Sequence, residues 1–95
     1  MKTDVLSSIL DGQKGVRRDG ASYVLDDRIS ATVFAGTAGE LITVPRVVRI
    51  DLAKEIVTLQ TSKGERFFFP YEIVVGLKLE ETEERMRPGG GAGFR

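Results

Sequence analysis

Residues 56–79 read IVTLQTSKGERFFFPYEIVVGLKL, and this stretch decides which fold the sequence predicts. Ile56–Thr61 and Ile73–Leu79 show the alternating side chains of half-buried β-strands. Between them, Lys63–Gly64 is typical of a tight hairpin connection, because glycine adopts a positive φ without strain. The connection leads into Arg66–Tyr71, which contains three consecutive phenylalanines and then a proline. We therefore expect three antiparallel strands in succession.

Two more strands are expected before this stretch. In residues 29–35 every second side chain is apolar, which predicts a half-buried strand, and Gly36–Gly39 predicts a turn. Glu40–Leu52 is rich in β-forming residues but contains Pro45, which cannot donate a ladder hydrogen bond and so marks a bend, bulge or edge. Because short links favour antiparallel neighbours, residues 29–79 predict a mainly β fold: a small, five-stranded, strongly bent antiparallel barrel.

Residues 1–28 are expected to form a short helix and a connection to the barrel. The pattern predicts the helix over Thr3–Leu10, with Thr3 or Asp4 as its cap and Gly12 after its end. A helix of this length is marginal alone in water and must dock on the rest of the domain. In residues 13–28, Asp19–Gly20 is a strong turn dipeptide, so this segment forms either a short hairpin or an ordered loop.

Residues 80–95 form a charged and then glycine-rich tail. Glu80–Met86 either extends the last strand or begins a helical turn. Its glutamates are read as a solvated surface, because no glycine-centred calcium loop surrounds them. Pro88–Arg95 cannot bury enough surface to offset its chain entropy, so we expect it to be mobile.

Composition argues against most catalytic chemistry. The chain of 95 residues contains no Cys, no His and no Trp. It therefore lacks disulfides, thiolate nucleophiles, Cys-based metal sites and the side chain that most readily moves protons near neutral pH. We expect a single non-catalytic domain with no cofactor and no metal. The formal net charge of zero, from 14 basic and 14 acidic side chains, argues against non-specific nucleic-acid binding.

The sequence also bears on location. Met1–Ser8 has a single lysine and no long apolar run, so it is not a secretory signal. No stretch approaches the roughly 20 apolar residues that span a bilayer. A cytoplasmic location without membrane contact follows as the expectation.

The three phenylalanines divide between two faces of their strand. Phe67 and Phe69 share one face, and Phe68 lies on the other. The favoured interpretation is that both faces are covered, one by the core and the other by the N-terminal helix or a neighbouring subunit. The alternative is an exposed aromatic face that stacks on bases or fills a partner's pocket.

Two local stretches carry a family resemblance. Ile50–Asp51, followed by Ile56–Leu59, is similar to the first Sm motif, in which an Asp ends the second strand before an apolar third strand. Phe69–Ile73 takes the place of the second motif, between the fourth and fifth strands. With the short helix in front, the chain resembles the Sm-like small β-barrel, in particular the bacterial Hfq type. The resemblance implies this fold and ring assembly through strand edges.

The resemblance does not extend to the usual uridine-binding residues. Pro70–Tyr71 stands where Hfq proteins carry a Lys–His pair and eukaryotic Sm proteins an Arg–Gly pair. Glu55 stands where the first motif has an Asn, and its negative charge repels phosphate.

The sequence therefore predicts a non-catalytic binding module that self-assembles edge to edge as a homo-oligomer. Two classes of ligand stay open. The first is RNA, with Phe68 and Tyr71 as stacking groups and Arg49, Lys63 and Arg66 as phosphate contacts. The second is a protein partner or a structural assembly, with the strand edge and the aromatic cluster as the docking surface.

Overall fold

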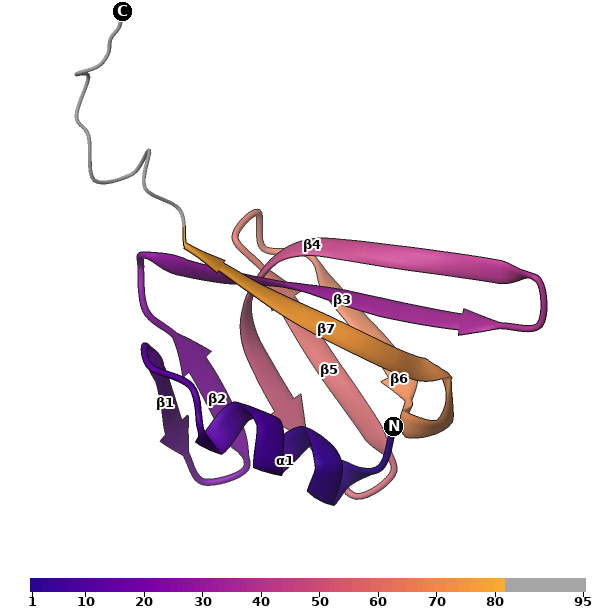
Figure 1. Ribbon diagram of the computed structural model, residues 1–95, viewed down its shortest axis with the longest axis horizontal. Helices are drawn as coiled ribbons and strands as arrows, with labels where there is room; N and C mark the ends of the chain where they lie inside the picture. Colours follow the sequence, from indigo (N-terminus) through magenta and orange to yellow (C-terminus); the bar gives the residue numbers. More distant parts are fainter. Residues whose placement is uncertain (82–95) are drawn as a thin grey trace, which may run out of the picture.

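The computed structural model describes residues 1–81, which form one short helix and a curled antiparallel sheet in the shape of a half-barrel (Figure 1). Nothing is described for residues 82–95, so the prediction for Glu80–Met86, from residue 82 on, and that for Pro88–Arg95 lie outside the described residues. The elements in chain order are α1 (Thr3–Asp11), β1 (Val16–Asp19), β2 (Ser22–Leu25), β3 (Ile29–Thr37), β4 (Glu40–Leu52), β5 (Ile56–Thr61), β6 (Arg66–Pro70), the 3-10 helix η1 (Tyr71–Ile73) and β7 (Val74–Glu81).

Strand β4 organises the sheet. It is 13 residues long and pairs with β3 along its first part and with both β2 and β5 along its second part. Opposite β3, the register shifts between Val44 and Val47, where Pro45 lies and where Arg46 has a φ of 60°. A second shift, between Val47 and Arg49, lies opposite β5. Of the three expectations for Pro45, a bend, a bulge or an edge, the structure shows a bulge. Such bulges bend a strand and explain how β4 curls the sheet.

Within residues 1–81 the sheet has seven strands rather than the predicted five, although residues 29–81 supply five of them, β3 to β7. The extra strands, β1 and β2, form the hairpin that the sequence left open for residues 13–28, and Gly20 takes a φ of 65° in its two-residue loop. This hairpin joins the sheet through β2 and β4, where the Leu52 N–H donates to the Ala21 carbonyl at 2.8 Å. Its inward side chains, Tyr23 and Leu25, are buried. The sequence pattern did not show this attachment, because β1 and β2 are only four residues long each.

The core fills the inner side of the curled sheet, and α1 lies across it with Leu6 and Leu10 buried. The helix ends before Gly12, as predicted, but its N-cap is Lys2 rather than Thr3 or Asp4. The physical reason is a long-range contact. The Met1 amino group donates to the Tyr71 and Val74 carbonyls at 2.6 and 2.7 Å, which holds the entry to the helix against η1.

The last strand is displaced from its predicted alternation. Ile73 belongs to η1, Val74 is buried, and Val75 is exposed, so the expected apolar face is reversed at this point. A register shift between Phe34 and Ala35 of β3 leaves Val75 as the extra residue of β7 and causes the reversal. Beyond it Leu77 and Leu79 face inward, and β7 continues to Glu81.

Candidate functional site

Strand β6 divides its phenylalanines as the sequence predicts. Phe69 is buried, Phe67 is half-buried with its ring centroid 6.3 Å from that of Phe69, and Phe68 points outward with 62% of its surface exposed. Helix α1 packs on the inner side and so does not cover Phe68. Within the described chain, the favoured interpretation is therefore wrong as regards the helix, and cover by a neighbouring subunit stays a prediction.

Three of the predicted site residues lie on the outer surface of β4, β5 and β6. Gln60 of β5 pairs with Arg49 on one side and with Arg66 on the other, so these three residues form one cross-strand row. Phe68 follows two residues after Arg66 and therefore points to the same side. Basic and aromatic groups meet here, as a nucleic-acid surface requires.

Arg49 is already engaged within the protein. Its Nε lies 3.1 Å from Oδ1 of Asp51, and its Nη2 donates to the Ser22 hydroxyl at 3.2 Å. The Ser22 hydroxyl also donates to Asp51. This cluster ties β2 to β4, so the contribution of Arg49 to any ligand competes with a structural role.

The other two predicted residues lie apart from this row. Lys63 is exposed in the turn between β5 and β6, whereas Tyr71 follows the far end of β6 in η1. Five residues of β6, at about 3.3 Å each, separate them. The Tyr71 hydroxyl donates to the Ala53 carbonyl. The structure therefore does not bring Arg49, Lys63, Arg66, Phe68 and Tyr71 into one site.

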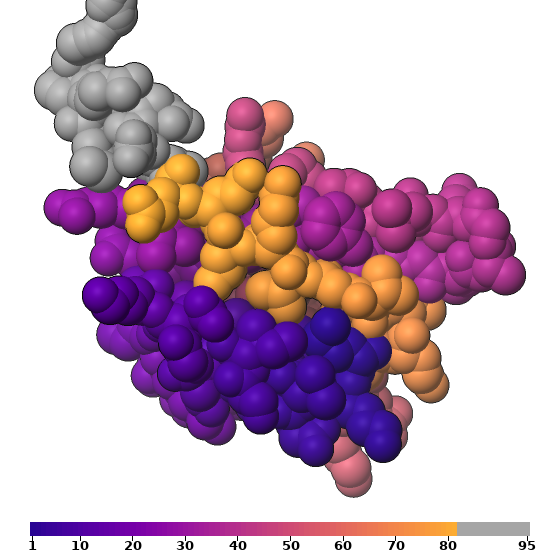
Figure 2. All heavy atoms as spheres, in the orientation of Figure 1, coloured from indigo at the N-terminus to yellow at the C-terminus, as the bar shows by residue number. Residues whose placement is uncertain are grey.

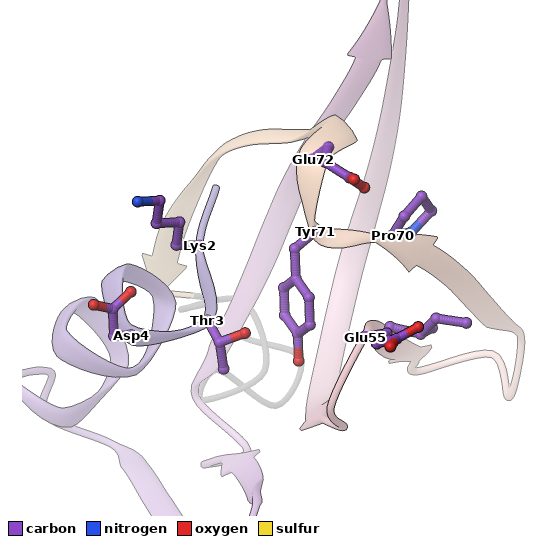
Figure 3. A pocket seen from close by; sticks show the side chains of 8 residues that line it. Lys2, Thr3, Asp4, Glu55, Pro70, Tyr71 and Glu72 are labelled. Atoms are coloured by element: carbon purple, nitrogen blue, oxygen red, sulfur yellow. The ribbon is translucent and has the colours of Figure 1, made fainter.

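Tyr71 instead lies in an open groove of about 780 Å³, formed by three segments that are far apart in the sequence (Figure 3). Its ring lies between Thr3 of the helix start and Glu55 of the turn before β5. The groove is lined by Lys2, Thr3, Asp4, Glu55, Ile56, Pro70, Tyr71 and Glu72. Sequence reasoning did not find it, because nothing in the sequence places the first residues of the chain beside η1.

Another exposed apolar region is the far part of the β3–β4 hairpin, which projects from the body of the molecule (Figure 2). Leu41 and Ile42 are 64% and 43% exposed there. They pair with Gly36 and Ala35 of β3, on opposite faces of a two-stranded ribbon. The hairpin therefore offers two small apolar faces rather than one broad one.

Residues 1–81 show neither a carboxylate cluster suited to a metal ion nor a helix suited to crossing a membrane. Residues 1–81 contain no group of three or more Asp and Glu side chains placed to hold a metal ion. None of their helices combines the length and the apolar character needed to cross a membrane. Comparisons with protein-family models, with curated proteins and with solved structures gave no match.

Proposed function

We propose that the protein is a non-catalytic binding module whose copies join edge to edge, with β6 of one copy pairing antiparallel to β7 of the next. The observation that carries this proposal is that both strands lie at an edge. Among the described residues β6 pairs with β5 alone, and β7 pairs with β3 alone. Unpaired backbone groups of an edge strand bind another strand readily. The absence of His and Cys from the whole sequence supports a role without catalysis.

The free backbone groups of β6 belong to its outward residues. The Thr61 N–H donates to the Glu65 carbonyl at 2.9 Å, which makes these two residues a bonded pair. Bonded and non-bonded pairs alternate along antiparallel strands, so Phe67 and Phe69 direct their backbone groups toward β5. Phe68 and its outward neighbours direct theirs toward the free edge.

The free backbone groups of β7 belong to its inward residues. Thr37 and Glu40 close the two-residue loop between β3 and β4, which makes them a bonded pair. Bonded and non-bonded pairs alternate along β3. The backbone N–H and C=O groups of Val33 therefore point toward β4, whereas those of Thr32 and Phe34 point toward β7. The partners of Val33 and Ala31 in β7, Leu77 and Leu79, therefore face the free edge.

One register matches these two edges in charge and in apolar character. With Arg66 opposite Glu81 of a second copy, Phe68 lies opposite Leu79 and Pro70 opposite Leu77. Leu77 and Leu79 are only partly buried against the core, and Phe68 is 62% exposed. Phe68 of one copy thus covers the incompletely buried leucines of the next, which strengthens an edge pairing by side-chain packing.

Sedimentation of paired variants tests the assembly. We expect the protein to be larger than a monomer at micromolar concentration and Phe68→Ser to be monomeric and folded. Leu41→Ser is the matched control, because Leu41 is similarly exposed at 64% but belongs to neither β6 nor β7. A strictly monomeric protein, or dissociation by Leu41→Ser rather than Phe68→Ser, contradicts the proposal.

Charge reversal tests the register. Arg66→Glu and Glu81→Arg each place like charges opposite one another and weaken association by about threefold to tenfold. The double variant restores association, since it re-forms the pair in the opposite order. Lys63→Glu, the same charge change in the adjacent turn, serves as the control. Failure of the double variant to recover rules out this register.

RNA binding is the second candidate function, supported by the outer row of Arg49, Gln60 and Arg66 beside Phe68. Such binding depends on phosphate contacts and weakens steeply with salt, whereas an apolar protein interface does not. Electrophoretic mobility of single-stranded RNA at low salt separates the two. No retardation of the RNA removes this candidate.

A further inference from the structure

The groove around Tyr71 has a fixed shape. The Tyr71 hydroxyl donates to the Ala53 carbonyl. The Tyr71 backbone carbonyl accepts from the Met1 amino group at 2.6 Å, so both the side chain and the backbone of this residue are held. The Met1 contact also holds the helix start, which forms the opposite wall. A volume of about 780 Å³ lies within the usual range of ligand sites, about 300–1,000 Å³.

The groove is lined by apolar surface and by acidic side chains. Ile56, Pro70 and Tyr71 supply apolar surface, and Ile56 is 43% exposed. The charged lining residues are Asp4, Glu55 and Glu72 against Lys2, which gives a net charge of −2, and the Met1 ammonium bonded to the Tyr71 carbonyl reduces it to −1. The Coulomb interaction with a phosphate is unfavourable here, and that with a cation is favourable.

We propose that this groove binds an arginine side chain in an extended basic segment of a partner protein. An arginine has an apolar stem that packs along Ile56 and Pro70, and a planar guanidinium that stacks on a Tyr ring. The guanidinium also donates to carboxylates through a fork of N–H groups, and Glu55 and Glu72 are among the residues that line the groove. Lysine lacks both the planar stack and the fork.

The site is separate from the outer row of Arg49, Gln60 and Arg66, and it shares only Pro70 with the edge of β6. Binding at this site is distinct from the proposed self-assembly, because its partner is a basic segment of another protein. A capped Gly-Ser-Arg-Ser-Gly peptide is a suitable probe. The same peptide with citrulline in place of arginine is its neutral counterpart of nearly identical shape.

Titration of the isotope-labelled protein with each peptide, followed by amide NMR shifts, tests the proposal. We expect the arginine peptide to shift Glu55, Ile56, Tyr71 and Glu72 but not Leu41, with the citrulline peptide at least about tenfold weaker. Glu55→Gln combined with Glu72→Gln reduces the affinity for the arginine peptide about tenfold or more. Asp19→Asn combined with Glu40→Gln removes two exposed carboxylates elsewhere and leaves the affinity unchanged.

Tyr71→Phe keeps the ring and retains binding, whereas Tyr71→Ala loses it; should Tyr71→Ala not fold, the Glu55 and Glu72 variant decides. The proposal is overturned by equal binding of the citrulline peptide, by an absence of shifts up to about 5 mM peptide, or by oligouridylate shifting the same amides. Phe68→Ser keeps the peptide shifts while it loses assembly, so the failure of one proposal is distinguishable from failure of the other.

Discussion

The two ends of the curled sheet differ in how their apolar surface is covered. At the closed end, formed by α1, β1 and β2, the chain covers itself, and Leu10 is completely buried. At the open end, formed by β6 and β7, Phe68 and Val75 are 62% and 58% exposed. One sheet therefore carries a surface completed by its own helix and a surface that nothing in residues 1–81 completes.

The polar contacts at the two ends also differ. At the closed end Asp11 accepts a hydrogen bond from the Tyr23 hydroxyl at 3.0 Å and one from Arg18, whose guanidinium carbon lies 5.4 Å from the Tyr23 ring centroid. At the open end, the ion pair between Lys78 and Glu80 joins two side chains of the same strand. The closed end is tied across elements by side-chain pairs, whereas the cross-element polar contacts near β6 and β7 include those from the Met1 amino group to the Tyr71 and Val74 carbonyls.

The largest difference between the two kinds of surface is expected in α1. Leu10→Ala removes a completely buried side chain and lowers the free energy of unfolding by about 2–5 kcal/mol. Val5→Ala, on the exposed side of the same helix, changes it by no more than about 0.5 kcal/mol. Urea denaturation of both variants measures this. Similar losses in the two variants contradict the docked position of α1.

Replacement of two strand glycines by alanine is expected to give a stability difference of intermediate size. At Gly36 of β3 an added Cβ lies 2.5 Å from the Glu40 carbonyl oxygen, so Gly36→Ala forces the backbone apart and costs about 1–3 kcal/mol. At Gly76 of β7 no heavy atom lies within 4 Å of the added Cβ. Gly76→Ala therefore leaves stability unchanged or raises it by up to about 1 kcal/mol. Thermal unfolding of both variants distinguishes these outcomes, and equal losses contradict the open environment of β7.

The smallest effect is expected from two ion pairs with the same spacing along a strand. Arg49–Asp51 at 3.1 Å also engages Ser22 of another strand, whereas Lys78–Glu80 at 3.2 Å engages no second strand. Asp51→Ala lowers the free energy of unfolding by about 1 kcal/mol, because solvent reaches both partners and weakens the pair. Glu80→Ala changes it by less than about 0.5 kcal/mol. Chemical denaturation at low and high salt compares the two, and a larger loss from Glu80→Ala contradicts the tie between β2 and β4.

The local features of the fold follow from the sequence more closely than its long-range contacts do. The strands of residues 29–70, the turn at Gly64 and the bulge at Pro45 follow from alternation, glycine and proline, which act within a few residues. The attachment of β2 to β4 depends on contacts about 30 residues apart, and the groove at Tyr71 on a contact across 70 residues. No local sequence pattern specifies contacts between residues so far apart along the chain.

The candidate site shows the same limit. The separation of Phe68 from Phe67 and Phe69 follows from strand geometry alone. The predicted turn and strand already place Lys63 and Tyr71 at opposite ends of β6, but the sequence could not show the 3-10 turn that sets Tyr71 beside the helix start. It also could not show that Asp51 and Ser22 engage Arg49.

The position of β4 has a consequence for how the domain opens. Because the second part of this strand pairs with both β2 and β5, it cannot separate without releasing two neighbours at once. Its backbone amides therefore exchange with deuterium through the slowest, most cooperative opening. We expect the amides of β6 and β7, which pair on one side within residues 1–81, to exchange faster than those of the second part of β4.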